Sequence, residues 1–264
     1  MPTNKSKTAK IISVTNQKGG VGKTTTTINL AAALSQLQKK VLIIDLDPQG
    51  NASTGLGVEV EDRELSTYEF LVEGVPLEKV TMETEISGLN IVPATIDLSS
   101  ADIDLISNEK RSHLLHDALR KKQQDKQKYD YILIDCPPSL NILTVNAMVA
   151  SHSVLIPLQS EFFALEGLSQ LLLTVKEVRQ TANENLRVEG IILTMFDGRN
   201  NLSKQVEADA RSNLRELVFK TIIPRNVRVS EAPSYSMPVL TYDPSSKGSK
   251  AYMSLAKELL ANNS

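Results

Sequence analysis

Residues 17–25 contain the residue types that bind phosphate groups, and they read QKGGVGKTT. Glycines let backbone N–H groups approach phosphate oxygens, and a helix N-terminus at this point adds positive potential. Lys23 would reach the β and γ phosphates, and Thr24 would place its hydroxyl on Mg²⁺. The strict pattern G-x-x-x-x-G-K-[ST] fails, because glutamine stands where the first glycine belongs and a second lysine, Lys18, follows it. The segment therefore predicts a nucleotide site with an altered phosphate loop, rather than a glycine-rich turn that only caps a helix.

Two further segments place carboxylates directly after apolar runs. Asp45 and Asp47 follow the run 41–44, and Asp135 follows the run 131–134. Ligands of open α/β sheets bind at the carboxyl ends of the strands, and an apolar strand that ends in an acid is the Walker-B arrangement, which holds Mg²⁺ directly or through water. Either acid alone is typical of a strand-end cap. Beside the phosphate loop, both indicate a metal and nucleotide site.

Strands and helices must alternate along the chain to position these groups. Runs that are apolar throughout predict strands covered on both faces, and helical spacing predicts helices between them. The predicted strands are 11–14, 41–44, 89–92, 131–134, 154–156 and 188–193, and the clearest helical patterns are 24–38, 112–126 and 165–181. We expect one α/β domain over residues 10–264, with a mostly parallel sheet and helices on both faces, after a flexible extension at residues 1–9. The acidic region 58–87 is expected to form short helices on one flank.

Composition excludes several classes of protein. With 41% hydrophobic and 23% charged residues the chain can bury a core, and its net charge of −2 excludes binding of polyanions by bulk positive charge. One cysteine, Cys136, and three histidines leave neither a disulfide framework nor a closed zinc site within one chain. We assign Cys136 no chemistry. No apolar run approaches the roughly 20 residues of a membrane span, so we expect a cytoplasmic protein without a membrane partner.

Four segments resemble the signatures of one family. Residues 18–24 look like the deviant Walker A motif, and residues 45–51, 135–139 and 223–228 are similar to the other signatures of the ParA/Soj chromosome and plasmid partitioning ATPases. This family lies within the wider ParA/MinD group. The resemblance runs from about residue 10 to residue 260 and implies a single P-loop NTPase domain.

The resemblance also implies an activity, which is hydrolysis of ATP with Mg²⁺. Lys18 would cross the interface of an ATP-sandwiched homodimer to touch the nucleotide of the other copy, and Lys23 keeps the role given above. Asp47 resembles the acid that positions the attacking water, and the division of roles between Asp45 and Asp47 stays open. The implied catalytic residues are Lys18, Lys23 and Asp47, and the implied metal-binding residues are Thr24, Asp45 and Asp135. The implied nucleotide contacts are Lys18, Gly19, Gly20, Val21, Gly22, Lys23, Thr24, Thr25, Met195, Pro224 and Asn226.

Met195, Pro224 and Asn226 resemble the lining of the family's adenine pocket, although Met195 is equally typical of core packing. Residues 187–250 hold ten Lys+Arg and seven Asp+Glu, which gives +3 and leaves −5 for the remainder. Charge alone would be typical of a solvated face. By resemblance, however, this region carries the family's basic residues for DNA binding without sequence preference. These residues are Arg199 and Arg228, with Lys247 and Lys250 as extensions of the same surface.

The function implied is that of a nucleotide switch in DNA segregation. An ATP-bound dimer would bind double-stranded DNA, and hydrolysis, stimulated by a ParB/Spo0J-like centromere-binding protein, would release it from the nucleoid. A MinD-like membrane ATPase would need a basic amphipathic anchor, whereas residues 251–264 hold one lysine and resemble a docked helix. Two alternatives stay open: a cargo-positioning ATPase that uses the same switch, and a nucleotide-gated regulator, for example of replication initiation, in which hydrolysis is incidental.

Overall fold

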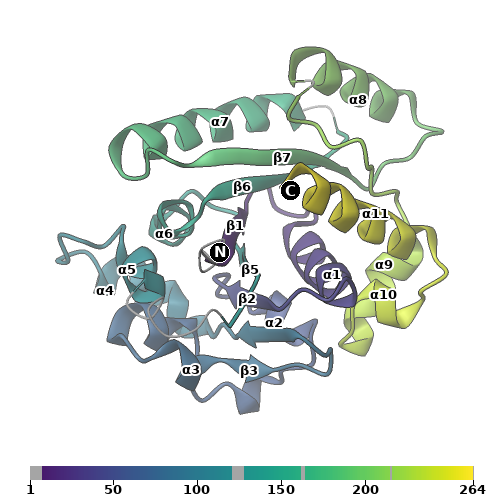
Figure 1. Ribbon diagram of the computed structural model, residues 1–264. Coiled ribbons are helices and arrows are strands. Elements are labelled where there is room, and N and C mark those ends of the chain that lie inside the picture. The colour runs from purple at the N-terminus through teal and green to yellow at the C-terminus, as the bar shows by residue number, and fades with distance from the viewer. Residues whose placement is uncertain (1–7, 121–127, 162–163, 215, 264) are drawn as a thin grey trace, which may run out of the picture.

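The chain forms a seven-stranded sheet with helices on both faces (Figure 1). This computed structural model describes residues 8–120, 128–161, 164–214 and 216–263. The strand order is β3-β4-β2-β5-β1-β6-β7, and every pair is parallel except β3 with β4. The strands are β1 (Lys10–Val14), β2 (Val41–Asp45), β3 (Met82–Glu83), β4 (Leu89–Val92), β5 (Tyr131–Asp135), β6 (Ser153–Gln159) and β7 (Arg187–Thr194).

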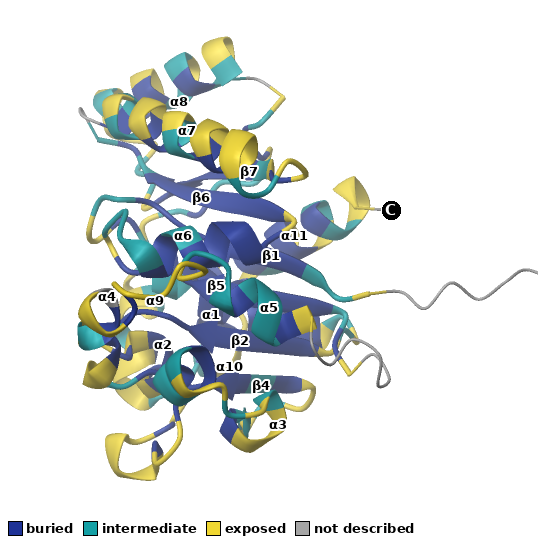
Figure 2. Cartoon of the chain, turned by 90° about the vertical axis from the view of Figure 1, so that its left-hand side faces the viewer, coloured by how far each residue is buried: buried dark blue, intermediate teal, exposed yellow. Residues whose placement is uncertain are grey.

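Neighbouring residues of each central strand pack against opposite layers of helices. In β2, Ile43 packs with α1 (Lys23–Gln36) and α11 (Lys247–Asn262) on one face. On the other face, Leu42 and Ile44 pack with α5 (Leu114–Arg120) and α6 (Ile142–Ala150). Figure 2 shows the strands as a buried layer between helices whose outer surfaces are exposed. The longer helices are α1 (Lys23–Gln36), α5 (Leu114–Arg120), α6 (Ile142–Ala150), α7 (Ala164–Thr181), α8 (Asn201–Leu214) and α11 (Lys247–Asn262). The short ones are α2 (Asn51–Thr54), α3 (Leu77–Val80), α4 (Ala101–Asp104), α9 (Val227–Glu231) and α10 (Val239–Tyr242).

The predicted architecture is confirmed, with differences at its margins. All six predicted strands are present, and the region 58–87 contains short helical turns at Val60–Asp62, Glu69–Glu73 and Leu77–Val80. The two-residue edge strand β3 was not predicted, since two residues carry no periodicity. Residues 1–7 of the predicted extension and residues 121–126 of the predicted helix 112–126 lie outside the described residues. No helix in the described ranges is both long and apolar enough to span a membrane.

The parallel register brings the predicted site residues to one edge of the sheet. Asp45 pairs in register with Asp135, and Asp135 pairs on its other side with Val14, after which the phosphate loop begins. Because all three strands run in the same direction, their carboxyl ends meet at this edge. The fold therefore places the loop and both acid-bearing strand ends next to each other.

Candidate nucleotide site

The phosphate loop leaves its backbone N–H groups open to a ligand. Gly20 and Gly22 have φ angles of 74° and 88°, which are in the left-handed region that favours glycine. Gly22 caps α1 without any side-chain hydrogen bond, so no side chain of the cap satisfies the first N–H groups of the helix. A Cβ atom added at Gly19 or Gly20 would meet nothing within 4 Å. The loop is therefore a cradle with room for an anion at a helix N-terminus.

Lys23 lies inside the site and not on its surface. Its side chain is buried, and its Nζ atom donates to the backbone oxygen of Lys18 at 3.1 Å. Burial lowers the pKa of Lys23, whereas the nearby carboxyl groups of Asp135 and Asp47 raise it. A buried ammonium group that is held by one carbonyl retains two further N–H donors for phosphate oxygens.

One carboxylate oxygen of Asp135 is uncommitted. Its Oδ1 atom accepts a hydrogen bond from Thr27 at 2.9 Å, and among the residues that the structure describes its buried Oδ2 atom has no hydrogen-bond partner. Burial and, after it, the charge of Asp45 raise the pKa of Asp135 to about 8, although hydrogen bonds from Thr24 and Thr27 oppose the rise. A bound cation would relieve both the missing partner and the cost of the buried charge, so Thr24 and Asp135 fit the predicted metal site.

Both carboxylate oxygens of Asp45 accept hydrogen bonds, in contrast to those of Asp135. Its Oδ2 atom accepts from the backbone N–H and the hydroxyl of Ser53 at 2.9 and 2.7 Å, and its Oδ1 atom accepts from the N–H of Asp47 at 3.2 Å. Burial raises the pKa of Asp45 to about 6 against these hydrogen bonds. Since both oxygens are occupied, the geometry favours Asp45 as the anchor of the loop that carries Asp47. This differs from the expected place of Asp45 among the metal ligands.

Asp47 faces the cavity beside the phosphate loop. It is 7% exposed, lines the cavity, and accepts a hydrogen bond from the N–H of Gln49 on its Oδ1 atom at 3.0 Å. No hydrogen bond within the described ranges uses its Oδ2 atom. Asp47 is therefore placed to accept a hydrogen bond from water in the cavity, whereas Asp45 is not.

Arg63 supports this loop, although the sequence analysis did not single it out. Its buried guanidinium group donates to the backbone oxygens of Val58 and Ala94 and to the hydroxyl of Thr54, which lines the cavity. A side chain at Gly50 would clash with this group. Arg63 thus ties the segment after β2 to the end of β4. No sequence motif could have identified it, because its partners are separated from it along the chain.

Lys18 forms an ion pair with Glu161 of the same chain. Its Nζ atom lies 2.8 Å from the Oε2 atom of Glu161, and the two side chains are 41% and 47% exposed. Gln159 donates to the other carboxylate oxygen of Glu161. An exposed ion pair of this kind contributes about 1 kcal/mol at most to the free energy of the conformation in which it forms, so little energy is needed to separate Lys18 from Glu161.

The cavity beside the loop has a volume of about 470 Å³, which is within the range of small-molecule sites. Met195 lines this cavity, and its φ angle of 50° is uncommon for a residue other than glycine. The hydroxyl of the neighbouring Thr194 donates to the backbone oxygen of Val21 in the phosphate loop at 2.8 Å. Pro224 and Asn226 are not among the lining residues, although the buried Oδ1 atom of Asn226 has no hydrogen-bond partner in the described part of the chain. The residues of the predicted site that line this cavity are Gly19, Gly20, Gly22, Lys23, Thr24, Thr25, Asp47 and Met195.

The two raised pKa values predict how stability depends on pH. An unfolded aspartate titrates near pH 4, so between about pH 4 and 8 these two carboxyl groups bind more protons in the folded, ligand-free chain than in the unfolded chain. Their contribution to the free energy of unfolding therefore falls as pH rises through this window. We expect Asp135→Asn to raise the melting temperature of the ligand-free protein by about 2–4 °C or more at pH 8, and by less at pH 5.

Thermal unfolding followed by circular dichroism checks this prediction. Asp62→Asn, in the exposed turn Val60–Asp62, is the matched control and should keep the wild-type difference between the two pH values. An equal rise at pH 5 and pH 8 for Asp135→Asn would contradict a buried, charge-coupled carboxyl group.

The predicted basic residues come together from three segments. The N–H of Phe196 donates to the Ile223 oxygen, and the N–H of Arg225 donates to the Phe196 oxygen, so the loop after β7 lies beside the segment that leads to α9. Side chains at the start of α11 are packed against α9, where a side chain at Gly248 would clash with Val229. The exposed cations of this surface are Arg199, Arg225, Arg228, Lys247 and Lys250, of which Arg225 was not predicted.

Two of these cations are paired with neighbouring acids. Arg199 forms a bidentate pair with Asp197 at 2.9 and 3.0 Å, although it is 92% exposed. Arg228 lies 2.9 Å from Glu231 and 3.5 Å from Asp243. The surface is therefore less positive in this state than its lysines and arginines alone would make it.

The chain is similar to several known proteins over nearly its whole length. A protein-family model described as an AAA domain matches residues 9–188. The sporulation initiation inhibitor protein Soj of Bacillus subtilis is 51% identical over 253 residues, which cover 96% of this chain and 99% of that protein. The chromosome partitioning protein ParA of Caulobacter vibrioides is 50% identical over 252 residues, covering 96% and 94%. A solved structure of cobyrinic acid a,c-diamide synthase from Mycobacterium smegmatis, with bound ADP and magnesium, is 36% identical, covers 96% and 95%, and superposes with a TM-score of 0.82.

Proposed function

This chain belongs to the ParA/Soj family of partitioning ATPases, and we propose that ATP switches it from a monomer to a homodimer that binds double-stranded DNA without sequence preference. Hydrolysis then releases the dimer, and a ParB/Spo0J-like centromere-binding protein stimulates this step during segregation of chromosomal or plasmid DNA. The observation that carries the proposal is the second lysine of the loop. The Lys18 side chain is half-exposed beside the phosphate loop, and within the described residues its ammonium group pairs with Glu161.

The residues at the sheet edge fit ATP and Mg²⁺. The open loop and Lys23 would bind the phosphates, and Thr24 and Asp135 would hold the metal ion. No group of three or more histidine, cysteine or acidic side chains within the described ranges could hold a metal alone. This suits Mg²⁺, which commonly uses one or two carboxylates together with waters and substrate phosphates. When bound, it would neutralise the negative charge on the β and γ phosphate oxygens.

Two side chains would carry the catalytic steps around the bound nucleotide. Asp47, held in place by Asp45, would accept a hydrogen bond from the attacking water and orient it toward the γ phosphate. Lys18 of one copy would contact the phosphates in the other copy and add positive charge where the leaving group becomes negative. Because only ATP offers a γ phosphate to this lysine, the dimer would persist with ATP and dissociate after hydrolysis.

The basic surface would bind the phosphate backbone of DNA. Its exposed cations come from the loop after β7, from α9 and from the start of α11, and dimerisation would double their number. Binding by phosphate contacts ignores base sequence and weakens steeply with salt. The pairs of Arg199 and Arg228 with their acids would have to open on binding, which keeps the affinity low enough for release.

Replacement of Arg228 by alanine tests this surface. We expect weaker binding of the ATP-bound protein to random duplex DNA, with a slope of log affinity against log salt that is smaller by about two, one phosphate contact for each copy of the dimer. Fluorescence anisotropy at several salt concentrations measures both quantities. ATP binding should be unchanged, since Arg228 lies outside the cavity.

Lys257→Ala is the matched control, because Lys257 is an exposed lysine of α11 that is not part of the predicted surface. It should bind DNA like the wild type. Asp197→Asn, which releases Arg199 from its bidentate pair, should bind more tightly. Equal affinities for DNA of the wild type, Arg228→Ala and Asp197→Asn at low salt would contradict the proposal that this surface binds DNA.

A further inference from the structure

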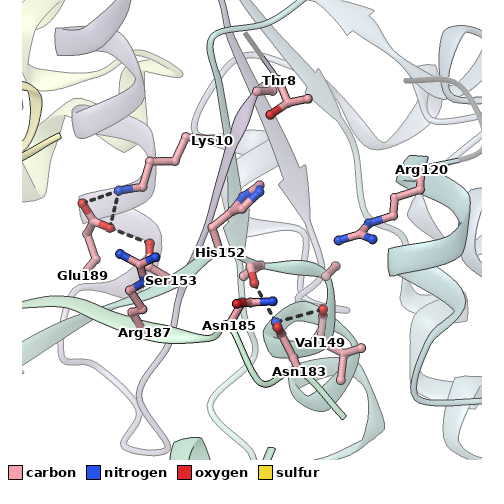
Figure 3. A pocket seen from close by; sticks show the side chains of 13 residues that line it. Thr8, Lys10, Arg120, Val149, His152, Ser153, Asn183, Asn185, Arg187 and Glu189 are labelled. Carbon is pink, nitrogen blue, oxygen red and sulfur yellow. Dashed lines mark hydrogen bonds and ion pairs between the residues drawn. The ribbon is translucent and has the colours of Figure 1, made fainter. Parts of the chain in front are cut away.

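A second cavity, of about 470 Å³, is shown in Figure 3. Its lining residues place it at the edge of the sheet opposite the nucleotide site. It is lined by residues at the amino ends of β1, β6 and β7, and it shares none of its lining residues with the first cavity. Strand β1 begins at this cavity with Lys10 and ends at the phosphate loop. Five strand residues separate the two sites by about 15 Å.

The lining of this cavity carries an excess of positive charge. Lys10, Arg120 and Arg187 line it, and Glu189 is its one carboxylate. Glu189 is already committed, because it pairs with Lys10 at 2.7 Å and accepts hydrogen bonds from Ser153 and Asn263. Within the described part of the chain, Arg120 and Arg187 form no ion pair. With His152 neutral, the cavity therefore has two more positive than negative charges.

His152 lies between the two arginines and offers a hydrogen-bond donor. Figure 3 shows Arg120 and Arg187 entering from opposite sides of its ring. The N–H of Ile11 donates to its Nδ1 atom at 3.0 Å, so the neutral ring carries its proton on Nε2. Burial lowers the pKa of His152, and the charges of Lys10, Arg120 and Arg187 lower it further.

The backbone around the cavity is arranged so that it does not repel an anion. The C-terminal end of α6 borders the cavity, and free carbonyl oxygens at a helix C-terminus carry partial negative charge. The Nδ2 atom of Asn183 donates to three backbone oxygens in and just after the last turn of α6, at 3.1 Å to Met148, 3.1 Å to Val149 and 2.8 Å to Ser151. Asn183 thus covers the groups that would oppose a negative ligand.

We propose that this cavity is a binding site for a small phosphorylated molecule, whose phosphate group is held by the uncompensated positive charge of Arg120 and Arg187, with Nε2 of His152 as a hydrogen-bond donor. A guanidinium group offers paired donors in the geometry that phosphate oxygens accept. A phosphate monoester carries −1.5 to about −2 near neutral pH, which matches the two uncompensated charges. The volume is sufficient for a ligand of this class.

Nuclear magnetic resonance of histidine-labelled protein tests the proposal directly. The chain has three histidines, so His113 and His116 serve as internal references for His152. Mg²⁺ and ADP are added first to fill the nucleotide site, and glycerol 3-phosphate is then titrated at constant ionic strength. We expect a saturable shift of the His152 ring signals without a shift of the other two.

Substitutions show which groups bind the probe. The double variant Arg120→Gln, Arg187→Gln should bind glycerol 3-phosphate at least about tenfold more weakly, because each lost guanidinium removes charge-assisted hydrogen bonds. Lys204→Gln, at an exposed lysine of α8, should bind it like the wild type. Stabilisation of each variant by Mg²⁺ and ADP against heat confirms that it is folded.

Three results would overturn the proposal. The first is a His152 shift of the same size with sodium chloride at equal ionic strength. The second is unchanged affinity in the double variant. The third is a shift with duplex DNA but none with glycerol 3-phosphate, which would assign the cavity to the DNA-binding surface. The titration of the wild-type protein decides the first and third without any variant.

Discussion

Replacement of Asp47 by alanine is expected to lower the rate of ATP hydrolysis by about 10²- to 10⁴-fold while ATP binding is retained. Asp47 lines the cavity and has one carboxylate oxygen that no hydrogen bond in the described ranges uses. Its loss removes the group that orients water, but it leaves the loop N–H groups, Lys23 and Asp135 in place. The variant should therefore accumulate as an ATP-bound dimer on DNA.

Steady-state phosphate release and binding of a fluorescent ATP analogue measure the two effects separately. Asp47→Asn keeps the shape of the side chain and should lose hydrolysis as well, because the amide is a weaker acceptor for water. Asp62→Ala, at an exposed acid outside the cavity, is the control and should hydrolyse ATP like the wild type. If Asp47→Ala hydrolyses ATP at the wild-type rate, hydrolysis is not timed by Asp47, and a nucleotide-gated regulator becomes the better interpretation.

Replacement of Lys18 by alanine is expected to weaken ATP-dependent dimerisation at least about tenfold without loss of ATP binding to the monomer. The side chain of Lys18 points to Glu161 at 2.8 Å and does not line the cavity of its own chain. Its contacts with phosphates would therefore arise only in the dimer. Light scattering after size exclusion, with the Asp47→Ala background to prevent hydrolysis, measures the dimer fraction.

The variant Glu161→Gln tests the same lysine from the other side of its ion pair. It frees Lys18 from its ion pair, so we expect a dimer that is tighter by a few fold at most, given the small contribution of exposed pairs. Lys204→Ala, at an exposed lysine of α8, should leave dimerisation unchanged. Dimerisation of Lys18→Ala at wild-type strength would contradict the role of this lysine across the interface.

The part of the fold that could be predicted is the part with local signals. Fully buried strands such as Val41–Asp45 are apolar up to their last residue, and the positive φ angles at Gly20 and Gly22 favour glycine in any context. The edge strand Met82–Glu83 has no such signal, because two residues pair only where β4 is already present. Its formation depends on tertiary context.

Some features of the candidate site could likewise be predicted from local motifs, whereas others depend on tertiary contacts. The motifs brought Lys23, Thr24, Asp47 and Asp135 to attention, and the structure gathers them at one edge of the sheet. The pairing of Lys18 with Glu161 joins residues 143 positions apart, and no spacing rule reveals it. The difference between the hydrogen bonds of Asp45 and Asp47 could not be predicted from the sequence either, because it depends on which carboxylate oxygens accept from Ser53 and Gln49.

DNA affinity measured in three nucleotide states tests the proposed coupling most directly. Anisotropy of a labelled random duplex is recorded with Mg²⁺ and ATP, with a non-hydrolysable ATP analogue, and with ADP. A switch that depends on the γ phosphate predicts tight binding in the first two states and affinity at least about tenfold lower with ADP. Equal affinity with ATP and ADP would contradict it, since a nucleotide that favours neither state cannot shift the population between them.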